Sequence, residues 1–161
     1  MDADYVRTLF DYGYWARDRL LKAAAGMSEA EYASDNGFTY KSIRGILTHA
    51  LAAEAAWSMR LRGEQVTGLP AQEELTSVEA LAARWRQVEV KMRGVLAELS
   101  DADLERMTTM RAGELPLWQI LAHLANHSMQ HRSEAAEALT MAGRSPGDLD
   151  MLFYFIEKRS S

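Results

Sequence analysis

Apolar residues recur at spacings of three and four along most of the chain. This is the period of an amphipathic α-helix that buries one face in a core. No stretch shows the strict apolar and polar alternation, or the clusters of β-branched residues, that mark strands. The pattern therefore predicts an all-α fold.

The first predicted helix runs from about Ala3 to Ala25 and stops at Gly26, a residue suited to the left-handed cap of a helix. A capping-box pattern from Ser28 to Glu31 predicts one short extra turn. The apolar positions assigned to the core face of the first helix are Tyr5, Leu9, Tyr12, Ala16, Leu20 and Ala23.

The second predicted helix runs from about Ser42 to Arg62 and ends at Gly63. Its apolar stripe is Ile43, Leu47, Ala50, Trp57 and Leu61. A second capping-box pattern, from Thr76 to Glu79, predicts the start of a third helix. Spacings of three and four typical of a bundle seam then continue through Val78, Leu81, Trp85, Val88, Met92, Val95 and Leu99. We interpret the tryptophan and methionine of this seam as core packing.

The fourth predicted helix begins near Leu115 and Pro116 and closes at Gly143. Ser145 and Pro146 then open a short C-terminal helix. The apolar residues of this last helix are Leu149, Leu152, Phe153 and Ile156.

The connection between the second and third helices, residues 63–75, is thirteen residues long. An extended chain of that length reaches roughly 40 Å, more than the roughly 30 Å that a helix of 20 residues spans. The connection can therefore cross the whole bundle. Helices two and three are then free to run parallel, in place of a simple up-and-down course.

Composition indicates one domain, residues 1–161, of the soluble globular class, with 48% apolar and 25% charged residues. The net charge is −5 and the pI about 5.4, so no overall positive field exists to attract nucleic acid or an anionic membrane. The sequence shows neither an apolar run of roughly 18 residues nor a basic leader. We expect a cytoplasmic protein.

Cysteine is absent, which excludes disulfides, thiolate catalysis by the chain and sulfur-ligated metal sites. Any metal must be bound through nitrogen and oxygen. Of the four histidines, His123, His127 and His131 lie within nine residues on the fourth predicted helix. Imidazoles four residues apart share one helix face and can chelate one ion. Spacing alone fits either neighbouring pair.

The position of each histidine around the helix favours one pair. At about 100° per residue, His131 lies nearest the apolar face, His127 next and His123 on the outer flank. The inward pair is therefore His127 and His131, with His123 expected to support the site from outside or to form a polar boundary. The apolar face used as reference is Leu117, Leu121, Leu124, Ala135 and Leu139.

His49, the remaining histidine, flanks the stripe of the second helix and can supply a ligand from a facing element. Three neutral imidazoles suit zinc, nickel, copper or ferrous iron and argue against calcium or magnesium. Three protein ligands would also leave one position open to water or substrate. Glu54 lies inside the same stripe, so we expect it to meet an arginine, a histidine N–H or the metal shell, or to lie partly solvated near a groove.

Three segments together resemble the DinB/YfiT-like superfamily over nearly the whole chain. The segments are an aromatic pair followed by tryptophan within 10–17, a serine, histidine, glutamate and tryptophan series within 42–57, and an Asn-His-x3-His-Arg motif at 126–132. A Gly-Arg-Ser-Pro tail at 143–146 is also similar. Four positions depart from the common pattern: Gly13, Arg17, Ser133 and Glu134. Substrate contacts are therefore not carried over to Ser133 or Glu134.

The resemblance implies a four-helix bundle with an up-down-down-up course and metal ligands at His49, His127 and His131. It also implies zinc or nickel as the metal and homodimer formation. Relatives include bacillithiol transferases and a mycothiol-dependent maleylpyruvate isomerase, which implies a low-molecular-weight-thiol S-transferase acting on a small molecule. In that hypothesis Arg132 or Arg44 would position the acidic part of the thiol.

Two alternatives stay open. The first is a metal-dependent hydrolase in which Glu54 or Glu134 takes a proton from water at the metal. The second is a metal-binding stress-response module without catalytic activity. The catalytic candidates from the sequence are Glu54 and Arg132.

Overall fold

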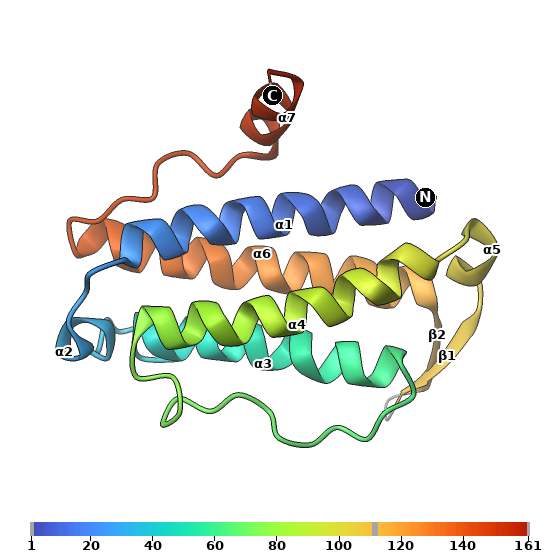
Figure 1. Cartoon of the computed structure of the whole chain (residues 1–161), viewed down its shortest axis with the longest axis horizontal. Helices are drawn as coiled ribbons and strands as arrows, with labels where there is room; N and C mark the ends of the chain where they lie inside the picture. Colours follow the sequence, from blue (N-terminus) through green and yellow to red (C-terminus); the bar gives the residue numbers. More distant parts are fainter. Residues whose placement is uncertain (1, 111–112, 161) are drawn as a thin grey trace.

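The computed structural model of the chain describes residues 2–110 and 113–160. Its long helices are α1 (Ala3–Ala24), α3 (Ile43–Leu61), α4 (Val78–Glu98) and α6 (Leu117–Met141), which lie side by side as a bundle (Figure 1). The shorter helices are α2 (Glu29–Tyr32), α5 (Asp101–Leu104) and α7 (Met151–Arg159). The predicted all-α four-helix bundle is confirmed.

The bundle has an up-down-down-up course. In Figure 1, α1 and α6 run in one direction and α3 and α4 in the other. Because α3 and α4 are parallel, the segment 62–77 between them passes along the length of the bundle, as the length of this connection allows. This course places α6 against both α1 and α3.

Side-chain caps fix most of the helix starts. Ser42 Oγ accepts a hydrogen bond from the backbone N–H of Gly45 at the start of α3, and Ser28 forms the predicted capping box of α2. The predicted box from Thr76 to Glu79 is wrong, because Ser77 caps α4 by accepting from the backbone N–H of Ala80. With Ser77 as the cap, no carboxylate stands three residues later to complete a box.

The core follows the predicted faces of α4 and α6, but that of α1 only at Ala16 and Leu20. The fourth-helix reference face and most of the α4 seam are buried. In α1 the buried face is centred on Val6, Phe10, Tyr14 and Leu20, whereas Tyr5 is 49% exposed. The core side of α1 also includes the charged Arg17, which the apolar pattern hides.

Two short strands, β1 (Met107–Met110) and β2 (Gly113–Pro116), pair antiparallel with Met107 opposite Pro116. No strand was predicted here, since four-residue segments are too short to show a period of two. Leu117 N–H donates to the carbonyl of Arg106 where β2 passes into α6.

The C-terminal helix begins later than predicted, at Met151 rather than at Ser145. Asp150 caps it, accepting from the backbone N–H of Leu152. The helix stands apart from the bundle (Figure 1), and Tyr154 anchors it by ring contacts with Tyr12 and Trp15. Three of the apolar residues expected in this helix are instead exposed: Leu152, Phe153 and Ile156.

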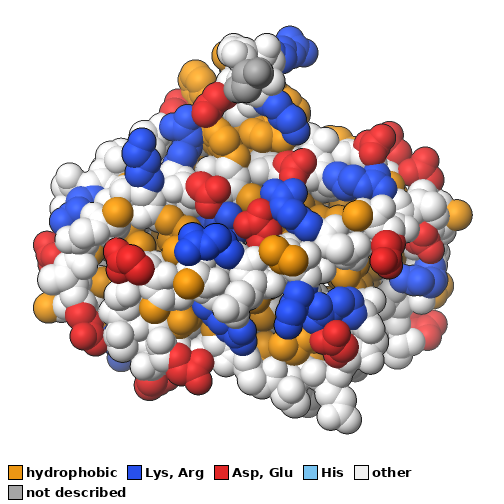
Figure 2. Space-filling model, viewed as in Figure 1, with side chains coloured by type: hydrophobic (Ala, Val, Ile, Leu, Met, Phe, Trp, Pro, Cys, Tyr) orange, Lys and Arg blue, Asp and Glu red, His pale blue; other side chains and the backbone are white. Residues whose placement is uncertain are grey.

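Acidic and basic side chains are interspersed on the face shown in Figure 2. Hydrophobic side chains gather on this face where α7 meets the bundle. None of the described helices combines the length and the apolar character needed to cross a membrane.

Candidate metal centre

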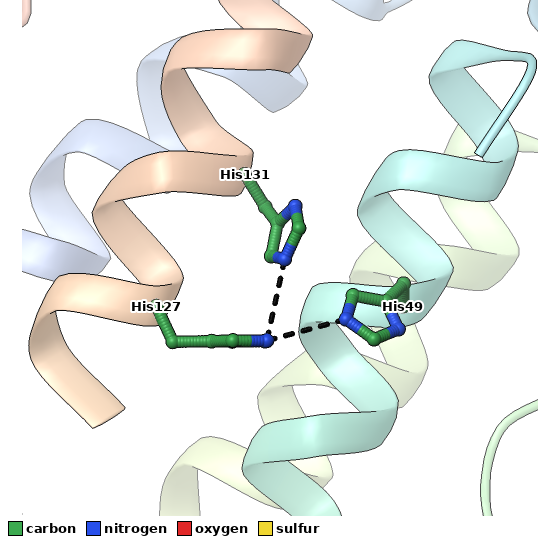
Figure 3. Close-up of side chains that lie close together, drawn as sticks. All are labelled: His49, His127 and His131. Carbon is green, nitrogen blue, oxygen red and sulfur yellow. Dashed lines mark hydrogen bonds between the residues drawn. The ribbon is translucent and has the colours of Figure 1, made fainter. Parts of the chain in front are cut away.

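Three histidine rings from two neighbouring helices point toward one another (Figure 3). His49 comes from α3, and His127 and His131 come from α6. The Nε2 atom of His127 lies 3.2 Å from Nε2 of His49 and 3.2 Å from Nε2 of His131. Two nitrogens bound at about 2.0–2.1 Å to a tetrahedral ion lie about 3.3 Å apart. The spacing therefore fits a shared metal ion, and the ligand atoms of all three residues lie within 4.8 Å of one another.

Burial along α6 follows the order that helical periodicity predicts. His131 is 4% exposed, His127 is half-buried and His123 is exposed. The ring of His123 has its centroid 5.8 Å from that of His127, and His123 is outside the three-residue cluster. The structure thus brings together His49, His127 and His131.

Glu134 orients the ring of His131. The Nδ1 atom of His131 lies 2.8 Å from Oε2 of Glu134, and Gln130 donates to the other carboxylate oxygen at 3.2 Å. Because a carboxylate accepts, Nδ1 carries the proton, and Nε2 presents its lone pair to the cluster. A carboxylate behind a ligating histidine is the usual support of such ligands.

Tyr40 lies against His49, a contact that the sequence pattern did not reveal. Its hydroxyl is 2.9 Å from His49 Nε2, and the two rings stack with centroids 4.0 Å apart. Gly45 permits this approach, since a Cβ atom there would lie 2.0 Å from the backbone oxygen of Tyr40. A glycine in the first turn of a core helix was the signal that could have located this contact.

Two histidines of the cluster, His49 and His127, resist protonation. Burial, followed by the charges of His131, His49 and His123, lowers the pKa of His127 to about 4. Burial and the neighbouring His131 also lower the pKa of His49. Both imidazoles are therefore neutral at pH 7, the state that binds a metal.

A cavity of about 30 Å³ lies beside His127 in the middle of the bundle. All four long helices contribute to its wall, and most of the exposed wall is apolar. Its polar side chains include Arg17, Glu54, His127, Ser128 and Arg132. Both catalytic candidates from the sequence, Glu54 and Arg132, thus share a cavity with one candidate ligand.

Glu54 is bound by partners other than those predicted. Tyr14 Oη donates to Oε1 and Trp85 Nε1 donates to Oε2, each at 2.8 Å. Burial raises the pKa of Glu54, while these two hydrogen bonds oppose the rise. Direct contact with an arginine or a histidine, as predicted, is not found among the described residues, because a phenol from α1 and an indole from α4 occupy both oxygens. Arg17 acts on Glu54 through its charge alone. Trp85 packs in the core, as predicted, and also donates this hydrogen bond.

Arg132 is 5% exposed and donates from Nη1 to Ser128 Oγ at 2.5 Å. Burial lowers its pKa. Gly13 gives it room, because a Cβ atom there would lie 3.2 Å from Arg132 Nη1. Arg44, the other arginine considered, lies outside this cavity wall and places its Nη1 3.6 Å from Glu29 Oε1.

The fold and the cluster define a class: a four-helix bundle with three imidazoles from two adjacent helices, compatible with a bound metal ion. The model of the DinB family matches residues 1–159, so the chain belongs to the DinB family. A comparison with curated proteins gives no match.

Proposed function

We propose that this DinB-family protein is a divalent-metal-dependent enzyme that transfers a low-molecular-weight thiol to an electrophilic small molecule. The observation that carries the proposal is the convergence of three imidazoles, with His127 Nε2 lying 3.2 Å from Nε2 of each of the other two, beside a cavity lined by Arg132 and Glu54. Zinc and nickel are the proposed metals, since the donor set is nitrogen alone.

The bound metal would act as a Lewis acid that favours the thiolate form of a thiol at neutral pH. His49 and His127 are half-buried, so a small thiol can reach the cluster from solvent. The chain has no cysteine, and the thiol must therefore be a second molecule.

Two side chains of the cavity are assigned roles in this proposal. Arg132 offers a buried guanidinium that binds and orients an acidic group of a reactant. Glu54, whose pKa is raised by burial, accepts the proton of the thiol at a carboxylate oxygen. Glu134 orients His131 and thereby supports the ligand set.

The proposal is tested by loading the purified protein with zinc, nickel or manganese and supplying cysteine with 1-chloro-2,4-dinitrobenzene. We expect conjugation that depends on the metal and is lost in the double variant His127→Ala and His131→Ala. A panel of further thiols and electrophiles extends the same assay. Absence of conjugation across the panel, with the metal shown to be bound, would contradict the proposal.

A second candidate, a metal-dependent hydrolase, is favoured by the position of Glu54 in the cavity beside His127. In it, Glu54 accepts a proton from water. Ester and amide hydrolysis that needs no added thiol would support this candidate. Metal binding without turnover of any substrate would leave a metal-binding module.

The proposal also includes a cytoplasmic location and a homodimer. Cell fractionation tests the first and sedimentation velocity tests the second. A membrane-bound fraction, or a monomer at micromolar concentration, would contradict the respective part.

A further inference from the structure

The cavity beside His127 contains two buried arginines. Arg17 is 4% exposed and Arg132 is 5% exposed, and they come from α1 and α6. Burying a cation is costly unless anionic or polar partners surround it. The partners that each guanidinium has, and lacks, therefore indicate what the cavity binds.

Arg17 is incompletely paired. Its Nη2 atom contacts Asp18 and Glu89 at 2.7 Å each, but its Nη1 atom is buried without a hydrogen-bond partner. An unmet buried donor costs about 1–3 kcal/mol, and more for a charged group. A ligand that accepts a hydrogen bond from Nη1 would remove this cost.

Arg132 has no ion pair within 2–110 and 113–160. Its Nη1 atom donates to Ser128, and its guanidinium carbon lies 5.5 Å from the ring centroid of Tyr12. The one carboxylate in the cavity wall, Glu54, is bound to Tyr14 and Trp85 through its two oxygens instead. Arg132 therefore lines the cavity without a carboxylate in direct contact, and the charge of Glu54 acts on it only at a distance.

The size of the cavity limits the ligand. About 30 Å³ exceeds the roughly 10–15 Å³ that one water molecule needs. A planar group of three heavy atoms suits this space, and guanidinium groups pair well with such a group when it is a carboxylate.

A groove of about 600 Å³ borders the cavity along the outside of α1 and α6. It is lined in part by Asn126, Met129 and Leu149, and it shares Leu9, Ala125 and Arg132 with the cavity. Arg132 thus lies at the boundary between groove and cavity. The remainder of a small organic acid can extend into the groove.

We propose that this cavity is a carboxylate-binding subsite formed by Arg17 and Arg132, and that it selects electrophilic substrates carrying a carboxylate. The subsite can bind a carboxylate without the metal. That this carboxylate belongs to the substrate rests on the proposed function. Ser128 Oγ, already bound to Arg132, lies in the same wall.

The test uses acetate as the probe, with metal-free full-length protein at pH 7.5. The reporter is the Trp85 indole N–H resonance in a ¹H–¹⁵N spectrum, because this group donates to Glu54 in the cavity wall. We expect acetate to shift the resonance saturably, and acetamide, the uncharged analogue, to leave it unchanged. The resonance of the Trp85 indole is assigned as the one that is missing from the spectrum of the Trp85→Phe variant.

Four variants separate the subsite from general damage to the fold. Arg132→Met and Arg17→Met should each weaken acetate binding about tenfold or more, since each removes a charge-assisted hydrogen bond. Arg86→Met, at an exposed position of α4, is the matched control and should leave binding unchanged. Glu54→Gln should tighten binding, because it removes the negative charge in the wall, a gain that misfolding would not produce.

The outcomes distinguish this subsite from the proposed transferase. Saturable acetate binding without any conjugation would support the subsite and contradict the transferase. Conjugation that is equally fast with carboxylate-bearing and neutral electrophiles, with no shift caused by acetate, would support the transferase and contradict the subsite. Equal acetate affinity in Arg132→Met, Arg17→Met and Arg86→Met would overturn the subsite.

Discussion

Single residues of the candidate metal centre differ in how far the sequence reveals them. A spacing of four on a helix makes the α6 pair visible, and the angular position of each residue ranks His131, His127 and His123 as the structure does. The residues that support the ligands differ in the same way. Tyr40 reaches the cluster through folding of a loop and leaves no spacing signal. Glu134 lies three residues after His131 on the same helix, a spacing that indicates contact.

The ligand assignment predicts a clear ranking of histidine variants. The double variant His127→Ala and His131→Ala should retain no zinc after gel filtration, because two of three nitrogens are lost. His123→Ala should retain most of it, since His123 lies outside the cluster. Inductively coupled plasma mass spectrometry measures the retained metal. Equal loss in His123→Ala would mean that the other helical pair binds the metal.

Glu134 is predicted to tune metal affinity without binding the ion. Glu134→Gln should weaken zinc binding about 10–100-fold in a competition titration, because His131 loses the carboxylate that orients its ring. Glu137→Gln, at an exposed position of the same helix, is the matched control. Unchanged affinity in Glu134→Gln would show that the carboxylate has no part in the centre.

At the scale of elements, the long periodic helices and the capped turn α2 were predictable, whereas α5 and the two strands were not. The ends of α1, α3 and α6 lie within about two residues of their predicted positions because caps and glycines mark them. The strands and α5 span four residues each, too few for a period. The rotation of α1 was missed because its aromatic and charged residues, Tyr14 and Arg17, face the core.

The close approach of the Tyr40 segment to α3 makes a prediction about Gly45. Gly45→Ala places Cβ 2.0 Å from the Tyr40 carbonyl oxygen, so the segment must move. We expect a loss of about 1–3 kcal/mol in the free energy of unfolding, and weaker zinc binding because the Tyr40 ring that stacks on His49 is displaced. Urea denaturation and zinc titration measure the two effects.

Gly94→Ala is the matched control within α4, where a Cβ atom meets nothing within 4 Å. This variant should stabilise the protein by about 0.4–1 kcal/mol, because alanine favours the helix and restricts the unfolded chain. A Gly45→Ala protein as stable as Gly94→Ala would contradict the described approach of loop to helix.

At the scale of the whole molecule, the course of the helices creates the site. Because α3 and α6 pack together, His49 meets two residues that are 78 and 82 positions away in the sequence. The long connection 62–77 permits this arrangement, and its length was visible in the sequence. The cavity was not predictable, because it depends on which side chains of four helices fail to fill the centre.

The lowered pKa of His127 predicts how the stability of the metal-free protein depends on pH. Above pH 6.5 the imidazole is neutral in the folded and unfolded states, and its contribution to the free energy of unfolding is fully present. As the pH falls from 6.5 toward about 4, the unfolded chain takes up a proton that the folded state resists, so stability is lost. The difference in urea midpoint between wild type and His127→Gln should shift across this window. A constant difference would contradict the burial of a neutral imidazole.

The most direct test of the central claim is a zinc-edge X-ray absorption measurement on the zinc-loaded protein, paired with anomalous diffraction. We expect one ion bound by three imidazole nitrogens at about 2.0–2.1 Å, from His49, His127 and His131, with the remaining position held by solvent or an added small molecule. An ion found elsewhere, or a fourth side chain closing the coordination sphere, would contradict it.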